Sequence, residues 1–368
     1  MHQEDYMKMA IELAKKGRGF VSPNPLVGAV IVKDKAVIGQ GFHEKYGSPH
    51  AERNAINSCV VSPKGGTLYV TLEPCCHYGK TPPCTDAIIE SGIKKVVIGS
   101  FDPNPLVSQK GIAILREHGI EVVEHVCREE CERLNKVFFH FIKTKMPYVT
   151  MKYAMTLDGK IATFSGKSKW ITAETARAHV QQERHNHTAI MVGVGTVLLD
   201  DPLLTCRMEG GVNPVRVICD SSLQTPLTAQ VIVTAKEIPT IIATSCNDLQ
   251  KWKPYEQAGC ELLAIPPKGK HLDLPELMRR LGEKSIDSIL LEGGAALNWS
   301  ALNERIVNKV CCYIAPKLFG GENAKTPVGG MGVEKPSDAF LLKNSIVMRL
   351  GEDMLIESEV EYPCLQEL

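Results

Sequence analysis

The order of strands and helices predicts an α/β protein made of two domains. Short β-branched runs alternate with stretches of helical periodicity, which is typical of sheets layered with helices. A chain of 368 residues is also longer than one hydrophobic core usually organises. The polar segment 143–147, which ends in proline, interrupts the pattern. We therefore expect domains at 1–145 and 146–368.

The first domain opens with a helix and continues through five strands. Apolar residues at helical spacing predict an amphipathic helix over 6–14, and Lys33-Asp34-Lys35 is typical of a hairpin turn. Strands are expected at 27–32, 37–41, 67–71, 95–99 and 121–123. The helices between them indicate a mainly parallel sheet. A last helix over 129–143 carries an apolar face that we interpret as packing or an interface rather than chemistry.

The most informative stretch runs from His50 to Cys84. His50, Cys75 and Cys84 offer one imidazole and two thiolates, the ligand set of a catalytic zinc that keeps a fourth position open. Such a zinc lowers the pKa of its water toward neutrality and so makes a nucleophile available. Glu52 follows the histidine as in the zinc deaminase signature, where the glutamate is the general acid/base and not a ligand. We expect these ligands near helix N-termini, whose dipole favours thiolates.

Other interpretations of this stretch stay open from the residues alone. The cysteines can be inert core residues, and a closed structural zinc site can use Cys76 or His77 as its fourth ligand. The order of His, Glu, Pro-Cys and Cys favours the catalytic site. Two loops carry candidate substrate contacts: the Asn24 amide, which matches a pyrimidine edge but is equally well a turn residue, and Lys80-Thr81, which can hold a phosphate.

The second domain repeats the alternation. Strands are expected at 148–152, 189–193, 215–218, 240–243 and 288–291, with helices at 173–184 and 275–281. No Gly-x-Gly-x-x-Gly follows the first strand, so the ordinary dinucleotide fingerprint is missing. Instead the last strand runs into Gly293-Gly294 before a helix, where backbone N–H groups can approach a phosphate. Such a turn is more often found without a ligand.

Composition limits the classes of function. Residues 1–145 carry 19 Lys and Arg against 16 Asp and Glu, so the basic excess of a nucleic-acid binder is missing and a small-molecule substrate is expected. The sequence has no apolar run long enough to span a bilayer, and its first residues do not form a signal peptide. Thirteen cysteines over a long chain fit free thiols in a reducing compartment. We therefore expect a cytoplasmic protein without a membrane partner.

Taken together, these motifs resemble a known family, the bifunctional riboflavin biosynthesis deaminase/reductases. The deaminase half is indicated by His50-Ala51-Glu52, by Glu73-Pro74-Cys75 through Cys84, and by 102–105. The reductase half is indicated by 154–160, 168–172, 193–207 and 292–294. The resemblance implies a cytidine-deaminase-like three-layer domain followed by a dihydrofolate-reductase-like α/β domain. Two departures stand out, because the family often has glycine at Gln109 and serine at Cys76.

The resemblance also implies cofactors, partners and site residues. Zinc and NADPH are the implied cofactors, pyrimidine ribosylamine phosphates the implied substrates, and a homo-oligomer the implied assembly. The implied cofactor-binding residues are Ala154, Trp170, Thr196, Asp200, Ser222, Gly294, Ala295, Ala296 and Leu297. The implied substrate-binding residues of the reductase are Lys152, Ser168, Arg184, Leu204, Arg207 and Glu292.

Two consecutive reactions follow from this resemblance. The first domain removes the 2-amino group of a diaminopyrimidinone ribosylamine 5′-phosphate, with Glu52 moving the proton, and NADPH then reduces C1′ of the opened ribose. Arg184 and Arg207 can bind the sugar phosphate through forked hydrogen bonds, although a surface ion pair is the default for a single arginine. The proton donor of the reduction stays open between Asp200 and Glu292. A nucleic-acid or nucleoside deaminase with an appended domain, and a zinc-stabilised binding protein, are the competing hypotheses.

Overall fold

The computed structural model describes residues 1–78, 82–104 and 108–362. The chain divides into two compact units, Met1–Lys145 and Met146–Leu368. Among the described residues, no helix has the length and apolar character needed to cross a membrane. The Lys80-Thr81 pair and residues 105–107 lie outside the described residues.

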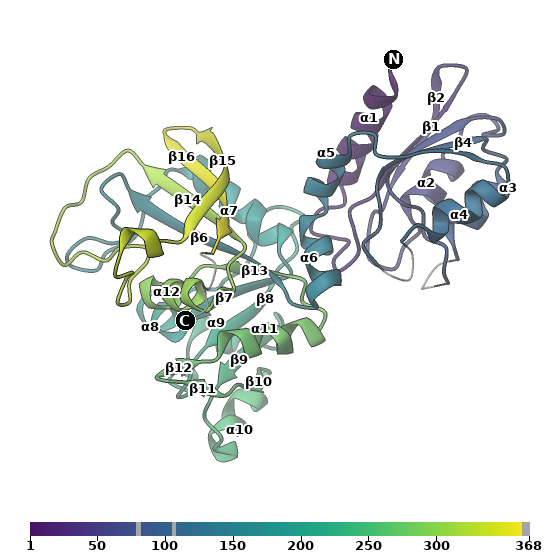
Figure 1. Cartoon of the computed structure of the whole chain (residues 1–368). Helices are drawn as coiled ribbons and strands as arrows, with labels where there is room; N and C mark the ends of the chain where they lie inside the picture. Colours follow the sequence, from purple (N-terminus) through teal and green to yellow (C-terminus); the bar gives the residue numbers. More distant parts are fainter. Residues whose placement is uncertain (79–81, 105–107, 363–368) are drawn as a thin grey trace. The chain divides into compact units, whose positions relative to one another are not determined.

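The first unit is a five-stranded sheet with helices on both faces. Its elements are α1 (Gln3–Lys15), β1 (Gly28–Lys33), β2 (Ala36–Phe42), α2 (Ala51–Asn57), β3 (Thr67–Leu72), α3 (Cys84–Glu90), β4 (Lys95–Ser100), α4 (Lys110–Glu117), β5 (Glu121–Val123), α5 (Arg128–Leu134) and α6 (Lys136–Thr144). Alternate strand residues point to opposite faces, so Val30 and Tyr69 pack with α1 while Ile31 and Leu68 pack with α2 and α3. Figure 1 shows α1 and α5 on one side of this sheet and α2, α3 and α4 on the other. The predicted three-layer fold is confirmed.

The prediction of a mainly parallel first sheet is wrong. The strand order is β2-β1-β3-β4-β5, with β1 antiparallel to both β2 and β3, whereas β3, β4 and β5 are parallel. The hairpin reverses the chain at Asp34 and Lys35, which both have the positive φ angles of a tight hairpin turn. The crossover through α2 then sets β3 on the far side of β1, so β1 lies between two strands that run against it.

The expected single helix over 129–143 is in fact two helices that meet at Asn135. Asn135 has φ −112° and ψ 22°, outside the helical region, and its side chain is buried. The Asn135 amide accepts a hydrogen bond from the Leu26 N–H at 2.8 Å and donates to the Leu26 carbonyl at 2.9 Å. This paired contact with a distant loop replaces the continuous helix and fixes the direction of α6.

The second unit is built on a nine-stranded sheet. Its elements are β6 (Tyr148–Thr156), α7 (Glu174–Asn186), β7 (Ala189–Gly193), α8 (Val194–Asp200), β8 (Val215–Cys219), α9 (Gln230–Val233), β9 (Thr240–Thr244), α10 (Leu249–Ala258), β10 (Glu261–Ala264), β11 (Pro267–Lys268), β12 (His271–Leu272), α11 (Leu274–Glu283), β13 (Ser288–Leu291), α12 (Ala295–Asn303), β14 (Lys309–Ala315), a 3-10 turn at Pro336–Asp338, β15 (Leu341–Leu350) and β16 (Asp353–Glu361). The strand order is β10-β9-β8-β7-β13-β6-β14-β16-β15. The strands are parallel from β10 to β14, and β16 and β15 extend this sheet antiparallel. The short β11–β12 pair forms a separate ladder.

The lengths of neighbouring strands create the opening of the second site. β13 ends at Leu291, which pairs with Met151, whereas β6 continues five residues further to Thr156. The chain after Leu291 turns away into α12, so the part of β6 from Lys152 onward has no β13 partner. Ligands in parallel α/β sheets bind beyond the carboxyl ends of such strands. The second cavity lies there.

Candidate active sites

The three predicted metal ligands of the first unit come together at two helix N-termini. His50 is the N-cap residue of α2, Cys84 is the first residue of α3, and Cys75 follows β3. The backbone N–H of Cys84 donates to the Cys75 sulfur at 3.3 Å. This position favours the thiolate form, because the N-terminal end of a helix carries partial positive charge. The hydrogen bond from the Cys84 thiol, followed by that from His50, lowers the pKa of Cys75 to about 4.

The spacing of the ligand atoms fits a tetrahedral zinc ion. The His50 Nδ1 atom lies 3.5 Å from the Cys75 Sγ and 3.4 Å from the Cys84 Sγ. Ordinary Zn–N and Zn–S bonds at a tetrahedral angle separate the two ligand atoms by about 3.6 Å. Among the described residues the cluster contains these three ligands and neither Cys76 nor His77. The donor set therefore matches an open zinc site rather than a closed structural one.

Glu52 lies beside this cluster because α2 packs unusually close to β2. A Cβ atom added to Gly41 of β2 would stand 2.3 Å from the backbone nitrogen of Ala55, so only glycine permits this approach. Glu52, in the first turn of α2, is 3% exposed, and burial raises the pKa of its carboxyl group to about 7. A carboxylate in this environment can hold and release a proton.

A cavity of about 320 Å³ opens over the cluster. Its walls include Asn24, His43, Glu52 and, from α6, Phe138 and Phe141. The Asn24 amide Nδ2 lies 3.2 Å from the His43 Nε2, and the His43 Nδ1 lies 3.2 Å from the Pro49 carbonyl. These contacts assign an N–H to Nδ1 and leave Nε2 as the acceptor, so Asn24 donates to His43. Asn24 is thus both a turn residue, through its N–H to the Val21 carbonyl, and a cavity residue.

Glu73, which lines the same cavity, holds the start of α4 in place. The buried Glu73 carboxylate accepts hydrogen bonds from the N–H groups of Gln109 at 3.0 Å and Gly111 at 3.2 Å. Gln109 has a φ of +62°. That left-handed conformation suits glycine and explains why the family often has glycine where this chain has Gln109.

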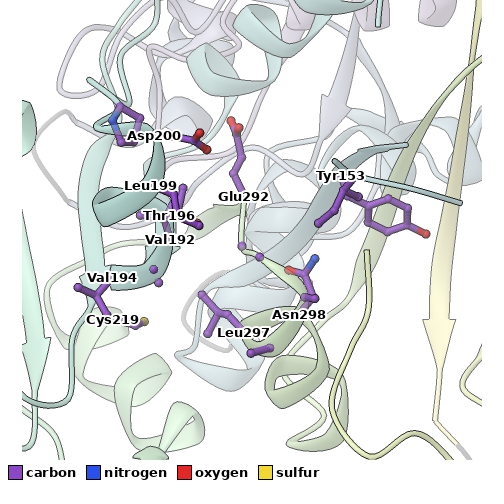
Figure 2. A pocket seen from close by; sticks show the side chains of 18 of the residues that line it. Tyr153, Val192, Val194, Thr196, Leu199, Asp200, Cys219, Glu292, Leu297 and Asn298 are labelled. Carbon is purple, nitrogen blue, oxygen red and sulfur yellow. The ribbon is translucent and has the colours of Figure 1, made fainter. Parts of the chain in front are cut away.

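A second cavity, of about 910 Å³, lies at the carboxyl ends of the parallel strands of the second unit. Figure 2 shows the Glu292 side chain projecting into it, with Thr196 and Asp200 on one side and Tyr153 on the other. The N-terminus of α12 at Gly294 forms part of the wall. Asn298 is fully buried, and its side-chain oxygen has no hydrogen-bond partner among the described residues. An unsatisfied buried acceptor costs stability, and this one belongs to a residue in the wall of the cavity.

Three charged side chains meet inside this second cavity. Arg184 of α7 holds both oxygens of Glu292, through Nε at 2.7 Å and a terminal nitrogen at 3.1 Å, and it also donates to the Thr205 carbonyl at 2.9 Å. The Lys152 Nζ lies 3.5 Å from the Glu292 Oε2, the oxygen that also accepts from the terminal nitrogen of Arg184. Burial disfavours the Glu292 charge, but Arg184 and Lys152 outweigh this effect and lower the pKa of Glu292 to about 2. Glu292 is therefore ionised at neutral pH and cannot act as the proton donor.

Comparison with known proteins gives the family. A model of the cytidine and deoxycytidylate deaminase zinc-binding region matches residues 1–100, and a model of the RibD C-terminal domain matches residues 147–356. The chain belongs to the RibD family. Riboflavin biosynthesis protein RibD of Actinobacillus pleuropneumoniae is 56% identical over 359 residues, covering 98% of this chain and 96% of the relative. Its counterpart from Escherichia coli (strain K12) is 38% identical over 369 residues, with coverages of 97% and 99%.

Solved structures agree with this assignment over nearly the full length. A diaminohydroxyphosphoribosylaminopyrimidine deaminase/5-amino-6-(5-phosphoribosylamino)uracil reductase from Thermotoga maritima has a TM-score of 0.86 and 42% identity, covering 98% of this chain and 99% of that one. RibD from Acinetobacter baumannii has a TM-score of 0.87 and 37% identity, with the same coverages. The predicted family, fold class and bifunctional deaminase and reductase are confirmed. This RibD-family chain carries a zinc-binding deaminase domain and a reductase domain.

Most of the residues implied for the reductase line its cavity. Those that do are Lys152, Ala154, Ser168, Arg184, Thr196, Asp200, Leu204, Ser222, Glu292 and Gly294 through Leu297. Trp170 and Arg207 are not among the lining residues. Trp170 is exposed, and the Arg177 guanidinium lies over its ring, 4.7 Å from the ring centre. Arg207 is exposed, and its backbone N–H donates to the Gln181 side chain at 2.9 Å.

Sequence reasoning missed several residues of the RibD-family sites. His43 carried no motif, and the only signal for it is a histidine close ahead of His50 in the chain. Phe138 and Phe141 were interpreted as packing, yet they line the deaminase cavity, because the break at Asn135 directs α6 there. The sequence suggests that Arg184 binds a phosphate, but its guanidinium donates to Glu292 instead. These two residues are 108 positions apart, so no local sequence pattern predicts their ion pair.

Proposed function

We propose that the chain catalyses two consecutive steps of riboflavin synthesis at two separate sites. Residues 1–145 hydrolytically deaminate 2,5-diamino-6-ribosylamino-4(3H)-pyrimidinone 5′-phosphate. Residues 146–368 then reduce the ribosyl chain of 5-amino-6-(5-phosphoribosylamino)uracil to ribityl with NADPH. The observation that carries the proposal is the zinc-spaced cluster of His50, Cys75 and Cys84 beside buried Glu52, in a chain that also has a large strand-end cavity.

In the deaminase site, His50, Cys75 and Cys84 would hold the zinc ion. When bound, zinc acidifies a water molecule and so supplies the nucleophile. Glu52 takes the proton of that water and delivers it to the departing amino group, because it is the buried carboxylate beside the ligand cluster. Asn24, oriented by His43, contacts the edge of the pyrimidine.

In the reductase site, NADPH binds along the strand-end crevice. The start of α12, from Gly294 to Leu297, offers backbone N–H groups to phosphate oxygens, and the bare Gly294 leaves room for close approach. Ala154, Thr196, Asp200 and Ser222 border the same crevice. The resemblance adds Trp170 to this cofactor side. NADPH supplies the hydride, and these residues orient it.

Lys152 is the proposed proton donor of the reduction. Glu292 is ionised, and Arg184 keeps its proton and is committed to Glu292. The Lys152 ammonium carries three N–H groups and has one long contact to Glu292, at 3.5 Å. It borders the cavity, so it can reach the oxygen that is released when the ribose opens. Asp200 faces the cavity from α8 and belongs to the cofactor side of this proposal.

The substrate phosphate requires cations other than Arg184. Lys169 and Lys325 border the cavity beside Ser168, and their loops are joined by the hydrogen bond from the Ile161 N–H to the Lys325 carbonyl at 2.9 Å. Lysine side chains that border a cavity suit a phosphate. We assign the phosphate to these lysines, with Leu204 lining the wall. Arg207 is exposed outside the lining, so its contribution is smaller.

The proposal extends to assembly and location. β15 forms the edge of the nine-stranded sheet and exposes Leu341, Leu342, Ile346 and Val347, with Val347 64% exposed. A long apolar edge strand is normally covered in solution, which supports a homo-oligomer that pairs copies along β15. The described cysteines are all free thiols, which supports the cytoplasm.

One experiment tests both sites. Purified protein receives the diaminopyrimidinone ribosylamine phosphate and NADPH, and we follow ammonia and then NADPH absorbance, with and without a zinc chelator. Ammonia followed by NADPH consumption is expected, with chelation stopping ammonia release. NADPH oxidation of separately supplied deaminated substrate should survive chelation. Failure of zinc-loaded protein to release ammonia would overturn the deaminase proposal, and ammonia without NADPH loss would overturn the reductase proposal.

A further inference from the structure

A buried tyrosine lies directly behind the reductase cavity. Tyr313 of β14 is fully buried and is not among the residues that line the cavity. β14 runs parallel to β6 with Cys311 opposite Lys152 and Tyr313 opposite Ala154. Side chains two residues apart on a strand share a face, so Tyr313 is the diagonal neighbour of Lys152. The Lys152 Nζ lies 5.8 Å from the centre of the Tyr313 ring.

The ring itself is held firmly in place. Its hydroxyl and the His179 Nδ1 of α7 are 2.9 Å apart, and its body packs with Val180 and Leu355. Burial raises the pKa of Tyr313, so the phenol stays neutral. The same helix α7 carries Arg184, which fixes Glu292, the carboxylate that lies 3.5 Å from the Lys152 Nζ.

Two fixed groups of different kinds therefore lie near the Lys152 ammonium. Glu292 attracts it, but the carboxylate is already held by both arms of Arg184, and the Lys152 contact is long. Four rotatable bonds leave a lysine ammonium free to swing unless a second attraction narrows its range. An aromatic face within about 6 Å of a cation supplies such an attraction, which strengthens when water is excluded. The Lys152 side chain is 15% exposed.

We propose that the Tyr313 ring is a positioning residue for the reduction, holding the Lys152 ammonium toward the reacting ribose. The proposal rests on the proposed role of Lys152 as proton donor. The ring acts through its electron-rich face and not through its hydroxyl. A cation–π contact that is largely desolvated corresponds to a factor of roughly 10 to 30 in rate.

The test uses the full-length chain, in which the deaminase activity measures how much protein is present and the fluorescence of Trp252 and Trp299 checks that the reductase unit is folded. Tyr313→Met keeps apolar volume but removes the ring, and we expect the kcat of reduction to fall about 10- to 30-fold with the KM for NADPH within about twofold. Tyr313→Phe should keep kcat within about twofold, because the face remains. Val310→Ala is the matched control: it opens the core beside the same strand β14, but in the cluster that does not contain Tyr313, and should leave kcat near wild type. Equal loss in Tyr313→Phe or in Val310→Ala would overturn the proposal.

A second series avoids any change of shape. Phenylalanines carrying one, two or three fluorines at position 313 keep the ring volume while weakening its electron-rich face. The kcat of reduction should fall stepwise with each fluorine, and a flat series would refute the positioning role even if Tyr313→Met did not fold. Lys152→Met separates the two proposals. Should that variant still reduce substrate normally, the role of Lys152 fails; if it is inactive and the fluorine series is flat, only the role of Tyr313 fails.

Discussion

Replacing Glu292 by glutamine removes one charge from the reductase cavity and keeps its shape. In the native protein that charge is held by Arg184 at 2.7 Å and Lys152 at 3.5 Å, and the Glu292 side chain is 12% exposed. The glutamine variant leaves two buried cations facing a neutral amide. Breaking a buried ion pair in this way is costly because the remaining charge stays out of water.

The size of the effect follows from the pKa. The pKa of Glu292 falls from its ordinary value of 4.5 to about 2, so the folded unit favours the charged form. At 1.36 kcal/mol for each pKa unit this corresponds to roughly 3 kcal/mol at neutral pH. Because the folded pKa lies below the unfolded one, the stabilisation is complete above pH 4.5 and is lost as the pH falls toward 2.

The assay is urea unfolding of the full-length protein, monitored for the reductase unit by the fluorescence of Trp170, Trp252 and Trp299, which all lie in that unit, and for the other unit by deaminase activity. At pH 7 Glu292→Gln should lower the free energy of unfolding of the reductase unit by about 3 kcal/mol, seen as a lower urea midpoint. The deaminase unit should be unchanged. Glu276→Gln is the control. Glu276 also has a pKa of about 2, because of hydrogen bonds from Arg279 and Arg280, but it lies on the exposed face of α11. Solvent screens that pair, so this variant should stay near wild type.

Two results would refute this reasoning. One is a Glu292→Gln reductase unit as stable as wild type at pH 7. The other is an acid transition between pH 4.5 and 2 that is unchanged in the variant, since the variant has no carboxyl group to protonate at this position. Either would mean that the charges of Arg184 and Lys152 are satisfied by water rather than by Glu292.

Three further predictions concern single side chains. Glu52→Gln should lower ammonia release by about 10²- to 10⁴-fold while zinc content and reduction of deaminated substrate stay normal, and parallel loss of both activities would contradict separate sites. Gln109→Gly should stabilise the deaminase unit by about 1 kcal/mol in urea unfolding, because its φ of +62° is strained for glutamine, and a decrease in stability would show that the side chain matters more than the backbone. Lys169→Ala should raise the KM of reduction for the phosphorylated substrate about tenfold, and Arg207→Ala by less; the reverse order would move the phosphate to Arg207.

The deaminase site could be predicted because its proposed ligands and acid/base residue all lie within one short stretch, residues 50–84. His50 and Glu52 occupy the start of one helix and Cys84 starts another, so helix geometry brings two of the three ligands to a dipole end, whereas Cys75 follows β3. The α/β layering followed from strand and helix periodicity, and the three-layer fold from the family resemblance. The direction of β1 did not, because alternation of strands and helices is the same for parallel and mixed sheets until the hairpin is counted.

The reductase site was harder to predict, and the reason is physical. The state of Glu292 depends on Arg184 and Lys152, which approach it from α7 and β6 and lie 108 and 140 positions away. Sequence patterns show which residue types are present but not which charges share a buried space. Arg184 illustrates this point: a forked guanidinium suits a phosphate and a carboxylate equally well, and only the fold decides between them.

The charge arrangement has a further consequence for catalysis. Both nitrogens of the Arg184 fork hold the Glu292 carboxylate, so its negative charge stays at a fixed position, 3.5 Å from the Lys152 Nζ. The same pairing occupies the guanidinium that would otherwise suit the substrate phosphate. In our proposal Lys152 is the proton donor, so the ion pair that removes Arg184 from phosphate binding also sets a fixed charge beside that donor.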